Sequence, residues 1–306
     1  MHTILGSNGA VGTALAKALN AYTESLRLVS RAPRRVNPGD ELMSLNLFDP
    51  AAVMKAVEGS DVVYVTIGFP GQGRLWSSNW LSFIQNVLAA ARENAARVVF
   101  FDNVLLYDPD HLGDMTESTP VRPITRKAAT RARVAEIVME AATSESPRTL
   151  IARSADLIAP TGSLVVEMVY RRLAAGENAQ WIGSLEKAHS CTYVHDAARA
   201  VALLGNTPEA FGRAWHLPTD PTPLTGAEWV ELFAREMGLT PRVDLLKSRS
   251  LKLSGLFNGQ TRELADIAYL FDREYRFKSE DFVAQFSMEP TPAAGAVNEI
   301  ITTMRR

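Results

Sequence analysis

The stretch that decides the fold is Gly6-Ser7-Asn8-Gly9-Ala10-Val11-Gly12, which directly follows Thr3-Ile4-Leu5. The apolar bias of residues 3–5 predicts a short buried strand, and residues 13–19 have the composition of a helix. A glycine loop between a strand and a helix directs backbone N–H groups and the positive end of the helix dipole toward a phosphate. The seven residues of the loop are therefore predicted to bind the pyrophosphate of a dinucleotide.

The three glycines have separate roles in such a loop: one makes the tight turn, one lets the backbone approach the phosphate, and one lets the helix pack closely on the strand. A turn of purely structural role also accepts glycine, so the triplet alone does not decide between the two interpretations. The place of the loop between a strand and a helix, with a second strand predicted at residues 26–29, favours nucleotide binding.

The composition is that of a globular protein. The 306 residues are 46% hydrophobic with a net charge of −2, and this balance indicates neither nucleic-acid nor membrane-surface binding. The single cysteine, Cys191, excludes an intrachain disulfide and fits a reducing compartment. Neither a signal peptide nor a long apolar run is found, so a cytoplasmic protein is expected. The five histidines lack the spacing of a metal site, and no metal is expected.

Strands and helices alternate along the chain as far as residue 101. Strands are predicted at residues 3–5, 26–29, 42–47, 61–68 and 97–101, and helices at residues 13–19, 51–58 and 76–94. This alternation predicts an α/β fold of the Rossmann type, a doubly wound parallel sheet with right-handed crossovers. Ligands bind such sheets at the carboxyl ends of the strands. Beyond the glycine loop, the predicted cofactor-binding residues at these ends are Ser30, Arg31, Arg34, Asn46, Leu47, Thr66, Ile67, Gly68 and Asn103.

The residues after the second strand decide which dinucleotide is expected. A carboxylate there would bind the ribose 2′-OH of NAD, whereas an arginine accommodates the 2′-phosphate of NADP. The segment from Leu26 to Pro38 contains no Asp or Glu, and it contains Arg31, Arg34 and Arg35. An arginine fork matches phosphate geometry, so NADP is predicted in preference to NAD. For Arg34 and Arg35 a solvated basic loop remains an equal alternative.

Five segments, spread over most of the chain, are similar to the motifs of one family. They are Gly6-x-x-Gly9-x-x-Gly12, Asp102 to Tyr107 (similar to Ser-Ser-x-x-Val-Tyr), Thr116 to Pro120 with Pro123 (similar to Thr-Glu-x-x-Pro-x-x-Pro), Arg153 to Pro160, and Tyr193 to Ala198 (similar to His-Val-x-Asp-Val-Ala). The chain thus resembles the extended and atypical short-chain dehydrogenases/reductases, which include nucleotide-sugar epimerases, dehydratases and NmrA-like proteins. The resemblance implies a nicotinamide cofactor and a small-molecule substrate, sugar-derived or acidic, and it leaves an oligomer open.

The chain departs from this family at the residues that move the proton. The family uses a Ser or Thr and a Tyr-x-x-x-Lys pair, and no Tyr-x-x-x-Lys occurs in the sequence. The resemblance places Lys127 at the tyrosine position, Arg131 at the lysine position and Asn103 at the serine position. The usual mechanism is therefore not expected.

Lys127 and Arg131 are the candidates to replace that machinery. They lie four residues apart and share one face of a helix that begins near Thr125. We expect Arg131 to contact the ribose or phosphate of the cofactor, and Lys127 to hold the cofactor, bind an acidic substrate group or donate a proton. Asn103 would hold a carbonyl or the nicotinamide by hydrogen bonds. The alternative is that the cations of this helix form only a solvated face: Arg126, Lys127, Arg131 and Arg133.

The predicted domains are an NADP-binding Rossmann domain at residues 1–155, to which residues 190–217 return, and a smaller substrate-binding portion at residues 156–306. In the smaller portion, helices are predicted at 163–175, 225–237 and 251–271, and strands at 179–182 and 242–246. Candidate pocket residues of this portion are Trp181, Tyr193, Arg262 and Tyr269, with a place in the core as the alternative for the aromatic ones.

Two functions remain open at this point. The first is an NADP-dependent oxidoreductase or an epimerase/dehydratase-like enzyme with a non-standard proton donor. The second is a non-catalytic, NADP-binding redox sensor of the NmrA-like type. Hydride transfer to a carbonyl substrate would support the enzyme, and cofactor binding without turnover would support the sensor.

Overall fold

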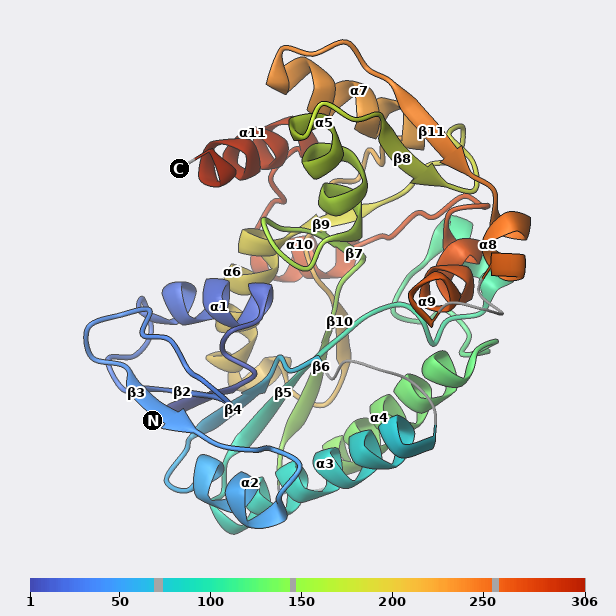
Figure 1. Cartoon of the computed structure of the whole chain (residues 1–306). Coiled ribbons are helices and arrows are strands. Elements are labelled where there is room, and N and C mark those ends of the chain that lie inside the picture. Colours follow the sequence, from blue (N-terminus) through green and yellow to red (C-terminus); the bar gives the residue numbers. More distant parts are fainter. Residues whose placement is uncertain (69–73, 144–146, 255–258, 306) are drawn as a thin grey trace. The chain divides into compact units, whose positions relative to one another are not determined.

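The computed structural model describes residues 1–68, 74–143, 147–254 and 259–305 (Figure 1). The chain forms two compact units. The first unit consists of Met1–Leu106, Arg126–Ser154 and Val194–Leu217, and the second of Tyr107–Thr125, Ala155–Tyr193 and Pro218–Arg306. Residues 107–125 therefore group with the second unit, whereas the sequence placed them in the first predicted domain.

The first unit is built on a seven-stranded sheet in which every pair of neighbouring strands is parallel. Its strands are, in the order of the sheet, β10 (Ala214–His216), β6 (Thr149–Arg153), β5 (Arg97–Asp102), β4 (Val62–Val65), β1 (His2–Leu5), β2 (Leu26–Ser30) and β3 (Glu41–Ser44). The predicted doubly wound parallel sheet is confirmed. The strand order reverses between β1 and β4, and such a reversal is where these sheets bind ligands.

Helices cover both faces of this sheet (Figure 1). They are α1 (Ala10–Leu19) and α6 (Val194–Gly205) on one face, and α2 (Pro50–Val57), α3 (Arg74–Glu93) and α4 (Arg126–Ala142) on the other. The predicted helical spacing on α3 is confirmed, because Trp80, Phe83 and Ile84 are buried in the core between α2–α4 and the sheet. Helix α2 begins where predicted, since Asp49 accepts a hydrogen bond from the Ala51 N–H and caps it.

Two strands of the first unit are shorter than predicted. β3 ends at Ser44 rather than at residue 47, and β4 ends at Val65 rather than at residue 68. The extra residues follow the strand ends as loops. The side chains of Asn46 and Thr66, which the sequence placed at the ends of strands, therefore lie on loops.

The second unit contains two small parallel sheets and several short helices. β8 (Ala179–Ile182) pairs with β11 (Val243–Leu246), and β7 (Asp156–Ile158) pairs with β9 (Cys191–Tyr193). The helices are a π-helical segment (Val166–Arg171) that continues into α5 (Arg172–Ala174), then α7 (Gly226–Met237), α8 (Ser248–Ser254), α9 (Gly259–Ile267), α10 (Glu280–Phe286) and α11 (Ala293–Met304). Because β9 pairs with β7, the segment that rejoins the first unit begins at Val194 rather than at residue 190.

Several local predictions for the second unit are confirmed. β8 and β11 fall where strands were expected, and α7 begins after Thr225, which forms a capping box with Glu228. The region predicted to be helical over 251–271 is helical in its described parts, as α8, α9 and a 3₁₀ turn at Ala268–Leu270, and residues 255–258 lie outside the described residues. Among the described residues, no helix combines the length and apolar character needed to cross a membrane.

Candidate functional site: the glycine loop of the first unit

The glycine loop passes so close to neighbouring backbone that two of its glycines cannot be replaced without movement. Gly6 has a φ of +98°, and a Cβ atom there would lie 2.5 Å from the Cα of Ile67. A Cβ atom on Gly12 would lie 2.5 Å from the carbonyl oxygen of Gly6. At Gly9 the nearest atom would be 3.4 Å away, so the strict requirement falls on the first and third glycines. This spacing lets the start of α1 pack against the end of β1.

The N-terminus of α1 presents backbone donors and no side-chain cap. Gly9 is the N-cap residue and makes no side-chain cap hydrogen bond, and the first intrahelical bond runs from the Thr13 N–H to the Gly9 carbonyl. The N–H groups of residues 10–12 precede that bond and have no partner within the helix. The buried Ser7 hydroxyl beside them has no hydrogen-bond partner among the described residues. Unpaired N–H groups and the helix dipole suit a phosphate.

Asn8 ties the glycine loop to the loop that follows β2. Its Nδ2 donates to the Ala32 carbonyl at 2.6 Å, and its Oδ1 accepts from the Arg34 N–H at 3.2 Å. Two serines at strand ends bond to the same loop. The hydroxyl of Ser30, the last residue of β2, accepts from the Ala32 N–H at 3.2 Å, and the hydroxyl of Ser44, the last residue of β3, donates to the Arg31 carbonyl at 2.8 Å. We call this loop after β2, which carries Arg31, Arg34 and Arg35, the basic loop. Side-chain hydrogen bonds thus fix the basic loop beside the glycine loop.

The three arginines of the basic loop have different surroundings. Arg31 and Arg34 are exposed, and within the described ranges neither guanidinium has a hydrogen bond or an ion pair. Arg35 donates to the carbonyls of Pro38 and Asp40, so its charge is used to close its own loop. Two of the three predicted phosphate ligands are therefore available to a bound anion.

The remaining predicted cofactor residues near β3 and β4 have mixed roles. Asn46 is exposed and its Oδ1 accepts from the Phe48 N–H at 3.2 Å, while the Leu47 side chain is buried in the core. The Thr66 hydroxyl donates to the Leu5 carbonyl at 3.2 Å and holds the end of β4 against the glycine loop. The backbone of Ile67 lies where a Cβ atom on Gly6 would stand, and Gly68 is exposed with no neighbour within 4 Å of a Cβ atom built there. Because its side chain is buried, Leu47 can contact a ligand only through its backbone.

Arg131 is buried in an ion pair rather than presented to solvent. Its Nε donates to Asp102 Oδ1 at 3.1 Å, and its guanidinium lies 4.7 Å from the ring centre of Trp80 and 5.0 Å from that of Phe100. A second arginine, Arg153, lies 3.2 Å from the other carboxylate oxygen of Asp102. This geometry gives Arg131 a structural role, and it offers no support for the expected contact with a cofactor.

Lys127 lies one turn before Arg131 on the face of α4 that meets α3. Its Nζ lies 5.8 Å from the ring centre of Trp76, and the Thr130 and Ser77 hydroxyls are 2.8 Å apart across the same pair of helices. The solvated-face alternative is therefore wrong for the buried Arg131, whereas Lys127 is half-buried beside Trp76. That alternative describes the exposed Arg133, whose pKa is raised by its hydrogen bond to Glu136.

Asn103 follows β5 and shapes the turn there. Its Oδ1 accepts from the Leu105 N–H at 3.0 Å, and the residue is half-buried. The amide N–H₂ of Asn103 makes no hydrogen bond within the part of the chain that the structure describes. The residue can therefore still donate to a ligand, but it cannot supply a proton.

The candidate pocket residues of the second unit divide between core and surface. Trp181 is buried and donates from Nε1 to the Ser184 carbonyl, and the Tyr193 hydroxyl donates to Glu299 at 2.6 Å. These two residues follow the core alternative. Arg262 is exposed on α9, and Tyr269 is half-buried.

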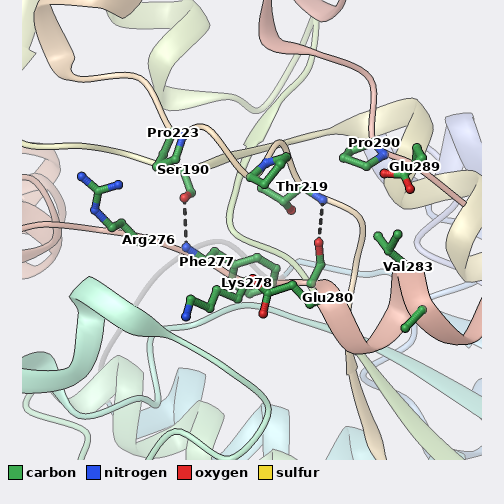
Figure 2. A pocket seen from close by; sticks show the side chains of 13 residues that line it. Ser190, Thr219, Pro223, Arg276, Phe277, Lys278, Glu280, Val283, Glu289 and Pro290 are labelled. Atoms are coloured by element: carbon green, nitrogen blue, oxygen red, sulfur yellow. Dashed lines mark hydrogen bonds between the residues drawn. The ribbon is translucent and has the colours of Figure 1, made fainter.

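A pocket that the sequence did not indicate lies within the second unit, with a volume of about 410 Å³ (Figure 2). Its walls include Ser190, Thr219, Phe277, Lys278 and Val283. The Ser190 hydroxyl accepts from the Phe277 N–H at 2.9 Å and the Lys278 ammonium pairs with Asp114, which raises the pKa of the lysine. The wall comes from separate stretches of chain, and no local motif marks them. Among the described residues, no group of three or more His, Cys, Asp or Glu side chains could hold a metal ion.

The parallel sheet, its reversal of strand order and the glycine loop define a Rossmann-type α/β protein of the dinucleotide-binding class. The family is narrower: the chain belongs to the NAD dependent epimerase/dehydratase family, whose model matches residues 2–216. The resemblance seen in the sequence motifs is thereby confirmed.

Solved structures of other proteins share the fold of this chain. The chain is 16% identical to the UDP-glucose 4-epimerase of Thermus thermophilus, solved with NAD (TM-score 0.79, covering 100% of this chain and 99% of that one). It is 19% identical to a short-chain dehydrogenase/reductase superfamily protein of Agrobacterium tumefaciens with bound NAD (TM-score 0.77, coverage 100% and 97%). It is 14% identical to the UDP-N-acetylglucosamine 4-epimerase of Methanobrevibacter ruminantium (TM-score 0.81, coverage 98% and 96%). No protein of curated function matches the chain. At these identities the likeness shows the fold alone.

Proposed function

We propose that the first unit binds NADP and that the protein is an NADP-dependent oxidoreductase or an epimerase/dehydratase-like enzyme. The observation that carries the proposal is the glycine loop: Gly6 and Gly12 leave no room for a Cβ atom, and the N-terminus of α1 has no side-chain cap. A phosphate placed there would accept hydrogen bonds from the N–H groups of residues 10–12. The buried Ser7 hydroxyl, which has no partner among the described residues, would supply one more donor.

Arg31 and Arg34 support NADP over NAD. Both are exposed without a partner in the described residues, and Asn8 and Ser44 hold the backbone of their loop beside the glycine loop. A 2′-phosphate would give each guanidinium a charge-assisted hydrogen bond. Ser30, Asn46, and the backbone of residues 47 and 66–68 would complete the cofactor site. The Agrobacterium and Thermus structures hold NAD, so this choice distinguishes the present chain from them.

When bound, the nicotinamide supplies a hydride acceptor or donor. The chain has no Tyr-x-x-x-Lys pair. We propose that Lys127, which stands at the family's tyrosine position, donates the proton to the substrate oxygen. Asn103 would donate its amide N–H to the substrate carbonyl or the nicotinamide. Arg131 is given no part in catalysis, because Asp102 already holds its guanidinium.

The substrate is proposed to be a small sugar-derived molecule. The Thermus structure is a UDP-glucose epimerase, and the Methanobrevibacter structure holds UDP-N-acetylmuramic acid. The pocket of the second unit, at about 410 Å³, is large enough for such a molecule.

A specific observation favours the second candidate, a non-catalytic NADP-binding redox sensor. Lys127 lies over the Trp76 ring and Arg131 is bound to Asp102, so both cations at the family's proton-transfer positions have partners inside the first unit. A protein in which neither cation reaches a substrate would bind the cofactor without turnover.

Calorimetry and a turnover assay test these proposals together. We expect NADPH to bind about tenfold or more tightly than NADH, and NADPH to be oxidised in the presence of UDP-4-keto sugars. Binding of NADPH with no oxidation across such carbonyl substrates would favour the sensor. No heat with either coenzyme, oxidised or reduced, would overturn both proposals.

A further inference from the structure

The glycine loop and the basic loop are joined by the side chain of Asn8. Asn8 is the third residue of the glycine loop, and its amide reaches the basic loop on both sides of Pro33. Nδ2 donates to the Ala32 carbonyl at 2.6 Å, and Oδ1 accepts from the Arg34 N–H at 3.2 Å. Only one orientation of the amide satisfies both partners, because a carbonyl needs a donor and an N–H needs an acceptor. Asn8 therefore holds the two sides of Pro33 in one fixed arrangement.

The second half of the basic loop depends on Asn8. Two serine hydroxyls hold the first half, at the Arg31 carbonyl and the Ala32 N–H. Pro33 follows with a fixed φ and no N–H to satisfy. Among the described residues, Asn8 is the only side chain that hydrogen-bonds to the Arg34 backbone. Loss of the Asn8 amide would therefore free the backbone at Arg34 and leave the start of the loop held.

The Arg34 guanidinium has no other contact that could fix its direction. The residue is exposed, and its guanidinium has no hydrogen bond and no ion pair within the described parts of the chain. Such a side chain is directed only by the backbone that carries it. A fixed backbone reduces the space that the guanidinium samples, and an anion that binds it then needs to order less of the loop.

Asn8 also belongs to the site proposed for the pyrophosphate. It directly precedes Gly9, the N-cap residue of α1. One residue thus lies in the loop that would bind the pyrophosphate and positions the loop that would bind the 2′-phosphate.

We propose that Asn8 is a positioning residue for coenzyme selection, which holds the backbone of the basic loop so that the Arg34 guanidinium meets the 2′-phosphate of NADP. The inference rests on the proposed function, which assigns NADP to this site. It adds a residue of the glycine loop to a selection that the sequence placed entirely after β2. The effect of Asn8 passes through the arginines of the basic loop.

Calorimetry with NADPH and NADH on the full chain tests this role. In Asn8→Ala both contacts are lost, so the preference for NADPH over NADH should fall about fivefold or more. The affinity for NADH should change much less, because NADH has no 2′-phosphate. An unchanged preference would overturn the inference. An equal loss of affinity for both coenzymes would limit Asn8 to the pyrophosphate site and would overturn it as well.

The matched control is Asn94→Ala, which removes the same pair of contacts elsewhere in the first unit. Asn94 Nδ2 donates to the Ala90 carbonyl at 2.9 Å, and its Oδ1 accepts from the Gly59 N–H at 3.0 Å. Gly59 and Asn94 precede β4 and β5, at the amino ends of the strands and away from the glycine loop. This variant should keep the wild-type preference for NADPH.

Asn8→Asp separates the donor of the amide from its acceptor. The variant has the size of asparagine and keeps an oxygen for the Arg34 N–H, but it turns a second oxygen toward the Ala32 carbonyl. The carboxylate would also compete with the 2′-phosphate for the Arg34 guanidinium. The preference for NADPH should therefore fall further than in Asn8→Ala, and a wild-type preference in this variant would contradict the proposal.

A double-mutant cycle tests whether Asn8 acts through the arginines. When Asn8→Ala is added to Arg31→Ala/Arg34→Ala, the NADPH/NADH ratio should not change further, because no guanidinium remains to be positioned. A further fall as large as the one in the wild-type background would show that Asn8 selects the coenzyme by another route. That result would overturn the inference.

The outcomes distinguish this inference from the proposed function. Wild-type protein that prefers NADPH, with the same preference in Asn8→Ala, would overturn the inference and leave the proposed function standing. Wild-type protein that binds NADPH and NADH equally would remove the choice of NADP, and selection by Asn8 with it, while coenzyme binding would stand. Wild-type protein that binds neither coenzyme would overturn both.

Discussion

The Arg131 guanidinium and the Asp102 carboxylate form a buried ion pair in the first unit, with Nε 3.1 Å from Oδ1 and with 7% and 1% of the two residues exposed. The Arg153 guanidinium lies on the other oxygen of the same carboxylate. The Asp102 carboxylate needs its charge, because removing it would take away the buried ion pair of the Arg131 guanidinium in a medium of low polarity. The cation at the family's lysine position is therefore paired with a buried carboxylate, which gives it a structural role in the first unit.

Replacing the carboxylate tests this structural role. We expect Asp102→Asn to lower the free energy of unfolding by about 3–5 kcal/mol, because it breaks a buried pair from one side. Urea denaturation followed by circular dichroism measures it. The control is Arg133→Met on the exposed face of α4, the helix that carries Arg131. It should have a far smaller effect, since the partners of Arg133, Glu136 and Glu140, are exposed as well. Equal stability of Asp102→Asn and the wild type would refute the structural role.

Gly12, the third glycine of the loop, should not tolerate a larger side chain. Gly12→Ala places a Cβ atom 2.5 Å from the Gly6 carbonyl oxygen, so either the loop or the start of α1 must move. We expect a stability loss of about 1–3 kcal/mol and a clear loss of NADPH affinity. Gly39→Ala is the matched control, because the nearest atom there is 3.5 Å away. Wild-type NADPH affinity in Gly12→Ala would show that the loop does not grip the cofactor.

The fold could be predicted from the sequence because its signals are local. The alternation of apolar runs with helical spacing predicted the sheet and its helices, and the helices predicted at 51–58 and 225–237 correspond to α2 and α7. The ends of β3 and β4 were placed too late, because apolar residues such as Leu47 continue past the last strand pairing and pack into the core from a loop.

The site could be predicted only in part, because its polar contacts join residues far apart in sequence. Helical spacing correctly put Lys127 and Arg131 on one face, but their partners could not be read from it: Asp102 lies on β5 and Trp76 on α3. The pairing of His189 with Asp156, 33 residues apart, depends in the same way on β7 lying beside β9. No local pattern specifies such a contact.

His2 should make the stability of the protein fall at mildly acidic pH. Its ring is buried on β1, with Nδ1 3.2 Å from the Tyr64 hydroxyl, and burial lowers the pKa of His2 to about 4. The unfolded chain, with a histidine pKa of about 6.5, binds the proton first, so stability is lost as the pH falls from about 6.5 to about 4. The loss should approach roughly 3 kcal/mol. Urea denaturation of the wild type and His2→Gln at pH 7, 5.5 and 4 measures it, and parallel profiles of the two proteins would contradict the assignment.

Lys127 should matter for turnover more than for folding. Lys127→Met keeps an unbranched side chain near Trp76 and removes the charge, so the fold should persist while turnover falls by at least about tenfold. Arg126→Met, one residue earlier and exposed, is the control and should turn over normally. Steady-state kinetics and NADPH calorimetry on both variants decide the point. If cofactor affinity and turnover of Lys127→Met match the wild type, the lysine is only a packing residue.

The basic loop should select the coenzyme through two arginines and not through the third. Each guanidinium of Arg31 and Arg34 that contacts a 2′-phosphate contributes a charge-assisted hydrogen bond of about 1.5–3 kcal/mol, so Arg31→Ala/Arg34→Ala should weaken NADPH binding at least about tenfold. NADH has no 2′-phosphate, and its affinity should stay constant. Arg35→Ala serves as the control, because its guanidinium is bound to the carbonyls of Pro38 and Asp40 and its loss should affect stability without changing the NADPH/NADH ratio. A double variant with an unchanged ratio would mean that the arginines are a solvated surface and that NADP is not the preferred coenzyme.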